Sequence, residues 1–172
     1  MNPRSINILL IGLLLTILNI HSVTAQRPVW SKAKAAEWYR SKGWLRGSDF
    51  IPSSAINQLE MWQAPSFDTG TINRELGYAA SIGLNCMRVF LHHLAWQQDP
   101  AGFKDRMHQY LEIAEKHHIV TIFVFFDDCW NETYSPGPQP APRPGIHNSG
   151  WIRDPANFTT TSPVSPTHSK NM

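Results

Sequence analysis

Gly83-Leu-Asn-Cys-Met-Arg-Val-Phe-Leu-His-His93 is the stretch of sequence that decides the fold. A glycine that ends a helix precedes an apolar strand, and the strand holds one arginine and is followed by two histidines. Because a buried parallel strand reads as a nearly continuous apolar run, Arg88 must face something polar. Side chains alternate along a strand, so we expect Arg88, Phe90 and His92 on one face and the residues between them on the other.

Helical and strand patterns alternate on both sides of this stretch. The strand-helix-strand-helix-strand order favours a parallel α/β sheet whose right-handed crossovers bring all three strand ends to one edge. After a first helix over 31–42, the predicted strands cover 44–50, 87–91 and 119–126, and the predicted helices between them cover 71–82 and 101–117. The apolar stripe of the last helix is predicted to be core: Phe103, Met107, Tyr110, Leu111 and Ala114.

Length and charge limit what the chain can be. With 172 residues, 42% hydrophobic and 16% charged, it suffices for one domain with a core but not for a whole barrel of about 250 residues. The formal net charge of +2 gives no electrostatic argument for a nucleic-acid partner.

The first 25 residues have the pattern of a cleaved signal peptide. Arg4 supplies the positive charge, Ile8 to Ile20 is an apolar run of 13 residues, and Val23-Thr24-Ala25 is a small-residue cleavage site. A transmembrane helix needs about 20 apolar residues, so it is the weaker reading. We therefore predict a secreted or periplasmic protein without a stable membrane anchor.

Two cysteines in an exported protein could form a disulfide. Cys86 begins one predicted strand, whereas Cys129 lies beyond the end of the next. On parallel neighbours they would be about 20 Å apart at about 3.3 Å per residue, and a disulfide needs Cα atoms within about 7 Å. The sequence therefore predicts two free thiols.

Polar side chains follow each predicted strand. Asp49 follows the first strand, His92 and His93 the second, and Asp127 and Asp128 the third. In α/β folds this edge of the sheet binds ligands.

A long loop over 51–70 is expected after the first strand, and such loops are usually functional or disordered. Its amide, carboxylate and indole groups, which favour a polar ligand site, are Asn57, Gln58, Glu60 and Trp62. From Glu132 onward the periodicity vanishes, and eight of the 13 prolines lie between Pro136 and Pro166. Residues 156–172 have the composition of a disordered tail.

Histidines and carboxylates near this edge raise the question of a metal site. Adjacent strand residues point to opposite faces, so His92 and His93 cannot both bind one ion unless the strand has already ended. The chain also has no H-E-x-x-H pattern, no G-x-S-x-G pattern and no glycine-rich phosphate loop. We expect no metal ion or other cofactor.

Carbohydrate chemistry fits the predicted edge better. Sugar sites combine carboxylates and amides for the hydroxyl groups with aromatic platforms for the apolar faces, and the chain has seven tryptophans. Four tryptophans are expected near the edge: Trp62, Trp96, Trp130 and Trp151. The alternative is that they only pack against the rim.

Three runs of sequence resemble a known family. They resemble the N-terminal part of secreted bacterial glycoside hydrolases related to cellulases and often labelled 1,4-β-xylanases, over roughly Trp30 to Pro155. The runs are Gly43-Trp-Leu-Arg-Gly-Ser-Asp-Phe-Ile-Pro-Ser-Ser-Ala-Ile-Asn-Gln-Leu-Glu-Met-Trp-Gln63, Met87-Arg-Val-Phe-Leu-His-His-Leu-Ala-Trp96, and Phe125-Phe-Asp-Asp-Cys-Trp-Asn131 with Pro144-Gly-Ile-His-Asn-Ser-Gly-Trp151.

The resemblance implies a (β/α)₈ barrel of the clan of retaining β-glycanases. In that clan an arginine on the second strand supports the nucleophile, and Arg88 matches it. The residues that the resemblance places along the sugar subsites are Asp49, His92, Asp127, Trp130 and Asn131.

The chain departs from the family in two respects. Gly47-Ser48-Asp49-Phe50 stands where the family usually reads Gly-x-Asn-Phe, so a carboxylate replaces an amide. Strands four to eight, which carry the acid/base and nucleophile glutamates, are missing. A retaining glycosidase needs two carboxyl groups about 5–5.5 Å apart, and the side chains of Asp127 and Asp128 are expected to diverge.

The predicted function is that of a glycoside hydrolase acting on a plant-type β-glycan such as xylan or cellulose, with polysaccharide or oligosaccharide as partner. The predicted parts are a signal peptide (1–25), about three βα units of a TIM barrel (26–155) and a tail (156–172), and the chain alone is expected to be inactive. Alternatives are a non-catalytic carbohydrate-binding fragment and a metal-dependent barrel hydrolase. Besides the supporting Arg88, the candidate substrate-binding residues are Asp49, Glu60, Trp62, His92, His93, Trp96, Asp127, Asp128, Trp130 and Asn131.

Overall fold

The computed structural model describes residues 28–155. The predicted signal peptide and tail lie outside the described residues, as does the predicted cleavage at Ala25. None of the helices within the described range is long and apolar enough to cross a membrane. The chain divides into two units, one up to Gly43 and one from Trp44 onward.

The first unit contains the helix α2, Lys32–Lys42, as predicted. The Ser31 hydroxyl caps it by accepting a hydrogen bond from the backbone N–H of Lys34 at 3.2 Å. The helix ends at Gly43, whose φ of 65° is a backbone conformation that glycine adopts without strain.

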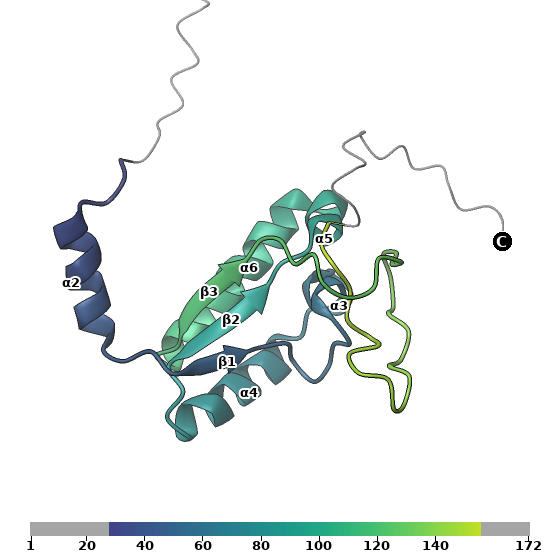
Figure 1. Cartoon of the computed structure of the whole chain (residues 1–172), viewed down its shortest axis with the longest axis horizontal. Coiled ribbons are helices and arrows are strands. Elements are labelled where there is room, and N and C mark those ends of the chain that lie inside the picture. Colours follow the sequence, from purple (N-terminus) through teal and green to yellow (C-terminus); the bar gives the residue numbers. More distant parts are fainter. Residues whose placement is uncertain (1–27, 156–172) are drawn as a thin grey trace, which may run out of the picture. The chain divides into compact units, whose positions relative to one another are not determined.

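Three parallel strands form the sheet of the second unit, in the order β1-β2-β3 (Figure 1). Their bounds are Gly47–Asp49, Cys86–Phe90 and Val120–Val124. The alternating α/β pattern and the parallel sheet are therefore confirmed. The first and third strands are shorter than predicted, whereas β2 has the predicted length but begins and ends one residue earlier.

Two long helices connect the strands, α4 (Thr69–Ser81) and α6 (Pro100–Lys116). An aspartate caps each of them: Asp68 accepts a hydrogen bond from the backbone N–H of Thr71, and Asp99 accepts one from that of Gly102. Residues of both helices and of β2 pack into one apolar core, which includes Ile72, Leu76, Met87, Val89, Phe103, Tyr110 and Ala114.

The two faces of the sheet differ. Met87 and Val89 are buried in the core, whereas the Arg88 side chain between them is 51% exposed. Strand register places Asp49, Arg88 and Ile122 in one row on this exposed face. Of the three residues predicted for the polar face of β2, only Arg88 is exposed, whereas Phe90 and His92 are buried. Leu111, predicted as core, is instead exposed on α6.

Two short helices follow β1 and β2, where the sequence suggested only loops. These are α3 (Gln58–Trp62), capped by the Asn57 side chain, and α5 (His93–Gln98), capped by His92. Both lie near the carboxyl ends of the strands (Figure 1). The segment 51–70 is thus not a continuous loop.

Residues 127–155 carry no long element but are tied to the rest of the unit. The backbone of Asp127 pairs with that of Asp154, and Asn131 pairs with Ile152. Ile152 is buried in the core. The amides of Asn57 and Gln58 donate to the carbonyl oxygens of Gly150 and Ile152, at 3.0 and 2.7 Å. The segment, green to yellow in Figure 1, therefore lies beside the carboxyl ends of the strands.

Candidate functional site at the carboxyl edge of the sheet

Arg88 and Asp49 form an ion pair on the exposed face of the sheet. They are register partners on β2 and β1, and Arg88 Nη1 lies 3.2 Å from Asp49 Oδ1. The guanidinium carbon also lies 4.6 Å from the centre of the Phe90 ring, a cation–π contact. The resemblance matched Arg88 to an arginine that supports a nucleophile glutamate; in the described residues its carboxylate partner is Asp49 on the neighbouring strand.

A pocket of about 330 Å³ lies beside this ion pair. Asp49 gives it a carboxylate, and Trp151 gives it an indole. Its lining residues are Asp49, Phe50, Ile51, Pro52, Ser53, Ala55, Ile56, Phe90 and Trp151. We call it the Asp49 pocket.

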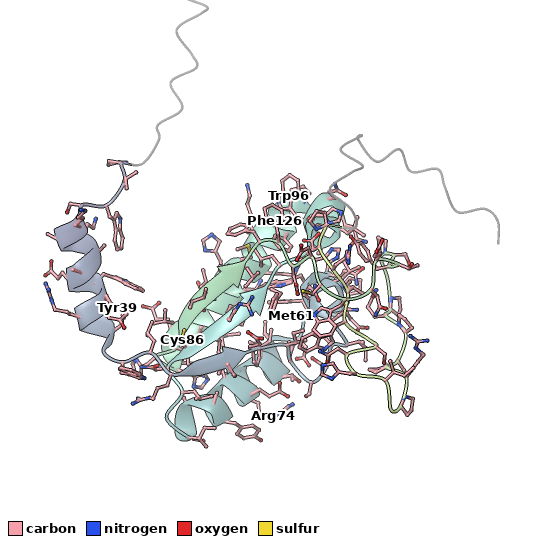
Figure 2. The ribbon with its side chains drawn as sticks, in the orientation of Figure 1. Tyr39, Met61, Arg74, Cys86, Trp96 and Phe126 are labelled. Atoms are coloured by element: carbon pink, nitrogen blue, oxygen red, sulfur yellow. The ribbon has the colours of Figure 1, made fainter. Side chains whose placement is uncertain are left out.

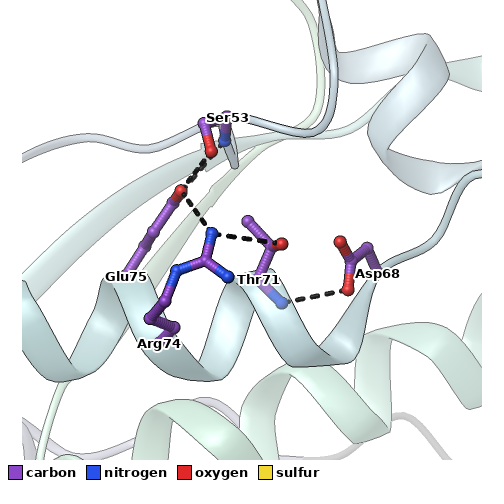
Figure 3. Close-up of polar contacts among 5 residues, drawn as sticks. All are labelled: Ser53, Asp68, Thr71, Arg74 and Glu75. Atoms are coloured by element: carbon purple, nitrogen blue, oxygen red, sulfur yellow. Dashed lines mark hydrogen bonds and ion pairs between the residues drawn. The ribbon is translucent and has the colours of Figure 1, made fainter.

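The segment after β1 that lines the Asp49 pocket is held to α4 by polar contacts of Ser53 (Figure 3). Glu75 accepts a hydrogen bond from the backbone N–H of Ser53 at 3.0 Å and also contacts the Ser53 hydroxyl. Arg74 Nη2 lies within hydrogen-bonding distance of Thr71 Oγ1 and of Glu75, at 3.3 and 3.4 Å. These bonds fix the backbone of one side of the Asp49 pocket.

An aromatic cluster forms around Trp130. The Trp130 ring packs edge-on against Trp151, with 5.5 Å between centroids, and against His147, with 5.6 Å. The side-chain amide of Asn131 donates to the carbonyl oxygens of Ser149 and Trp151, at 3.1 and 2.7 Å. Trp130 therefore packs against a residue that lines the Asp49 pocket, whereas the Asn131 amide holds the loop together.

His92 and His93 gather on the other side of β2 with a residue that the sequence did not suggest, Asp154. His93 Nδ1 contacts Asp154 Oδ1, and the backbone N–H of His93 donates to Asp154 Oδ2 at 2.9 Å. The two imidazole rings are stacked, with 5.1 Å between centroids. His92 and Asp154 are each 1% exposed.

Burial is the main reason that the pKa of His92 falls to about 4. The nearby His93 lowers this pKa further, whereas the Asp154 carboxylate and the Arg153 backbone act against the shift. His92 is therefore neutral at pH 7. Its Nδ1 accepts a hydrogen bond from the backbone N–H of Leu94 at 3.2 Å, which leaves the hydrogen on Nε2.

An apolar pocket of about 470 Å³ adjoins the two histidines. Trp96 and Phe126, which Figure 2 labels close together, both line it. The other lining residues are Leu91, His92, His93, Phe103, Lys104, Met107, Phe125 and Asp154. Trp96 thus lies at the predicted edge but lines a different pocket from Trp151.

Asp127 and Asp128 follow β3 as predicted, but their side chains do not diverge. Their carboxylates and the Cys129 thiol have atoms within 4.8 Å of one another, because the strand has already ended at Val124. Asp128 and Cys129 are exposed, and Asp127 Oδ1 accepts a hydrogen bond from the Cys129 backbone N–H at 3.3 Å. The group forms a solvated turn.

Two candidate residues are engaged in contacts within the protein, Trp62 fully buried and Glu60 half-buried. Trp62 is fully buried, and its indole N–H donates to the carbonyl oxygen of Phe90 at 2.7 Å. Glu60 accepts hydrogen bonds from the backbone N–H groups of Ile56 and Gln139, at 2.7 and 3.4 Å. Both were predicted to lie in an open loop, whereas the helix α3 turns Trp62 into the core.

No family model, no curated protein and no solved structure matches the chain.

Sequence reasoning included Trp151 among the aromatic residues but missed Asp154 altogether. The only signal for Asp154 is its place after a proline-rich segment without periodicity. Nothing in that pattern indicates that the segment returns to the end of β2.

Proposed function

We propose that this domain is the N-terminal, sugar-binding part of a retaining β-glycanase barrel that acts on a plant-type β-glycan such as xylan or cellulose. The observation that carries the proposal is the Asp49–Arg88 pair beside Trp151. It combines a carboxylate, a guanidinium and an indole at the carboxyl edge of a parallel sheet.

The chemistry of sugars fits these groups. Carboxylates and guanidinium groups make bidentate hydrogen bonds to neighbouring hydroxyl groups, and an indole packs against the apolar face of a pyranose ring. In the proposed barrel, the row of Asp49, Arg88 and Ile122 would point into the barrel interior, and ligands would bind at the carboxyl ends of the strands.

Hydrolysis needs more than the described residues supply. A retaining enzyme requires two carboxyl groups that flank the glycosidic bond about 5–5.5 Å apart. Asp49 is paired with Arg88, and Asp154 is buried against His93. Asp127 and Asp128 are close enough together, but they are adjacent in one turn and approach a substrate from the same side. Hydrolysis in the proposed enzyme therefore depends on further strands of a barrel.

A non-catalytic carbohydrate-binding protein is the second candidate. It is favoured by the Asp49–Arg88 pair, because that pair occupies the arginine which would otherwise orient a nucleophile. The two candidates share the binding surface and differ in hydrolysis.

Affinity electrophoresis in gels that contain xylan or carboxymethyl cellulose tests the shared binding surface. We expect the polysaccharide to slow the protein, and Trp151→Ala and Asp49→Asn each to reduce that retardation. Trp44→Ala is the matched control, because Trp44 is 79% exposed and lies before the opposite end of β1. Retardation by neither polysaccharide, or equal loss in the Trp44 variant, would contradict the proposal. The two candidates separate only in a complete barrel that contains this domain, where release of reducing sugar from either polysaccharide would favour the glycanase.

A further inference from the structure

We propose that the apolar pocket beside His93 binds a small phenolic acid, which is an aromatic ring that carries both a hydroxyl group and a carboxylate. The ring would lie in the pocket, the hydroxyl would bond to His93 Nε2, and the carboxylate would lie near the ammonium group of Lys104. His93 and Lys104 both line the pocket. The proposal does not depend on the sugar-binding function.

The pocket has the size and the lining of a site for a small molecule. Its volume of about 470 Å³ falls within the range of about 300–1,000 Å³ that is typical of such sites. Leu91 and Phe103 are buried and form its inner part, whereas Trp96, Phe125 and Phe126 are exposed at its rim. These side chains come from α5, α6 and the ends of two strands, so they surround a hollow rather than cover a flat face.

The Asp154 carboxylate fixes the orientation of the His93 ring. His93 Nδ1 contacts Asp154 Oδ1, and the backbone N–H of His93 donates to Asp154 Oδ2 at 2.9 Å. Because Nδ1 donates to the carboxylate, Nε2 is the ring nitrogen that remains for a ligand. Within residues 28–155, His93 Nε2 has no hydrogen-bond partner and is not among the buried unpartnered atoms. The pocket therefore offers one oriented and accessible imidazole nitrogen.

A hydroxyl group suits this nitrogen better than any other neutral group. A hydroxyl can donate to an unprotonated Nε2 and can accept from a protonated one, so the bond forms in either charge state of His93. Asp154 itself is 1% exposed and is occupied by His93, which keeps its carboxylate away from a ligand.

Lys104 supplies a positive charge at the rim. It is exposed on α6, next to the buried Phe103, and forms no ion pair with a carboxylate of the described residues. Asp154 is the one acidic residue of the pocket lining, and it is paired with His93. Charge complementarity therefore favours a ligand that carries a carboxylate over a neutral or cationic one.

A second copy of the chain is the alternative occupant. Phe125 and Phe126 are 64% and 67% exposed, and exposed apolar side chains of this kind also occur at protein interfaces. A second copy would cover the apolar rim but would make no use of the oriented His93 Nε2. It would also exclude a small ligand, so the apparent affinity for that ligand would fall as the protein concentration rises.

Isothermal titration calorimetry of the full chain tests the proposal with three related compounds. They are para-hydroxyphenylpropionate, phenylpropionate, which lacks the hydroxyl, and para-ethylphenol, which lacks the carboxylate. We expect the first to bind with a Kd of about 1 mM or below, as its size implies. Loss of the hydroxyl should weaken binding about fivefold, the net effect of one hydrogen bond. Loss of the carboxylate should weaken it about threefold, because an exposed ion pair contributes little.

His93→Asn separates the two ring nitrogens. The asparagine amide nitrogen, like Nδ1, is bonded to Cγ, so it can still donate to Asp154, whereas nothing replaces Nε2. We expect this variant to bind para-hydroxyphenylpropionate no better than phenylpropionate, and to bind phenylpropionate as the unmodified chain does. His108→Asn is the matched control, on an exposed histidine of α6 outside the pocket, and should keep the preference for the hydroxyl.

Trp96→Ala tests the rim, with Trp44→Ala as its control on another exposed tryptophan. We expect the Trp96 variant to bind all three compounds about tenfold more weakly, because it loses the aromatic contact. The Trp44 variant should bind them unchanged.

Four results would overturn the proposal. They are no binding of para-hydroxyphenylpropionate by the unmodified chain, equal binding of phenylpropionate, equal loss of the hydroxyl preference in His93→Asn and His108→Asn, and an affinity that falls as the protein concentration rises. The comparison of the three compounds on the unmodified chain decides the matter if a variant does not fold. No polysaccharide is present, so the outcome is independent of glycan binding.

Discussion

The indole N–H of Trp62 donates to the carbonyl oxygen of Phe90 across 2.7 Å and so joins α3 to the last residue of β2. Trp62 also packs against Phe67, Phe103, Tyr110 and Phe123. A tryptophan that sequence reasoning assigned to a sugar platform thus holds the carboxyl edge of the sheet in place from within.

Replacing Trp62 by Phe should lower the free energy of unfolding by about 1–3 kcal/mol, because the buried Phe90 carbonyl loses its donor. Urea unfolding followed by circular dichroism measures this change. Trp44→Phe, at an exposed position, is the control and should stay within about 0.5 kcal/mol of the unmodified protein. Equal losses of unfolding free energy in the two variants would show that the hydrogen bond between Trp62 and Phe90 does not stabilise the fold.

The stabilising contribution of Asp99 should be lost in acid. The backbone N–H of Gly102 is the largest cause that lowers the pKa of Asp99, and hydrogen bonding to Arg106 adds to it. A carboxyl with a lowered folded-state pKa stabilises the fold above its unfolded pKa of about 3.9, and this stability is lost as pH falls through the folded value.

Asp99→Asn should therefore flatten the fall in Tm between pH 5 and pH 2, as measured by circular dichroism. Asp105→Asn, an exposed carboxylate on the same helix, is the control. If the Asp105 variant flattens the curve as much, the helix cap is not responsible.

The two thiols should differ in reactivity. Cys86 is buried and Cys129 is exposed, and both are free. Burial raises the pKa of the Cys86 thiol, which lowers its thiolate fraction near pH 8. We expect iodoacetamide without reductant to label Cys129 in the folded protein and both cysteines in urea. Mass spectrometry of peptides counts the labels, and a missing label in urea would indicate a disulfide.

The outer edge of β3 should promote self-association. Among the described strands, β3 pairs only with β2, and Ile122 is 48% exposed. Exposed apolar edge strands are templates for pairing between molecules. Ile122→Lys should therefore reduce the oligomer seen by size-exclusion chromatography, whereas Ile82→Lys, on an exposed residue after α4, should not. A monomeric unmodified chain would refute this prediction.

The chain from Gln26 onward should release no reducing sugar from xylan or cellulose above a blank, because no carboxyl pair of the described residues flanks a common substrate position. Asp127→Asn and Asp128→Asn provide the check. Hydrolysis that disappears in either variant would mean that the turn after β3 is catalytic after all.

The repeating parts of the fold could be predicted from the sequence. Helical spacing located α4 and α6, and the apolar run around Arg88 predicted its strand and the exposure of Arg88. These features depend on neighbours in sequence, so a single chain reveals them.

The carboxyl edge was predicted less well, because contacts distant in sequence decide it. Nothing near Trp62 indicates that it is buried, since its partners come from β2 and α6. Asp154 meets His93 only because the segment 127–155 folds back, and its prolines suppress the periodic patterns from which such a return could be inferred.

The side-chain amides of Asn57 and Gln58 find their partners late in the synthesis of the chain. Their carbonyl partners lie 93 and 94 residues later, whereas Asp49 and Arg88 are 39 apart. At about 5–20 residues per second, synthesis takes roughly 5–20 s to pass from α3 to Ile152. By the end of that time all three strands and both long helices have been synthesised, whereas the carbonyl partners of the two amides are only then being made. Among the described residues, the contacts that close the carboxyl edge of the sheet are therefore among the last that can form.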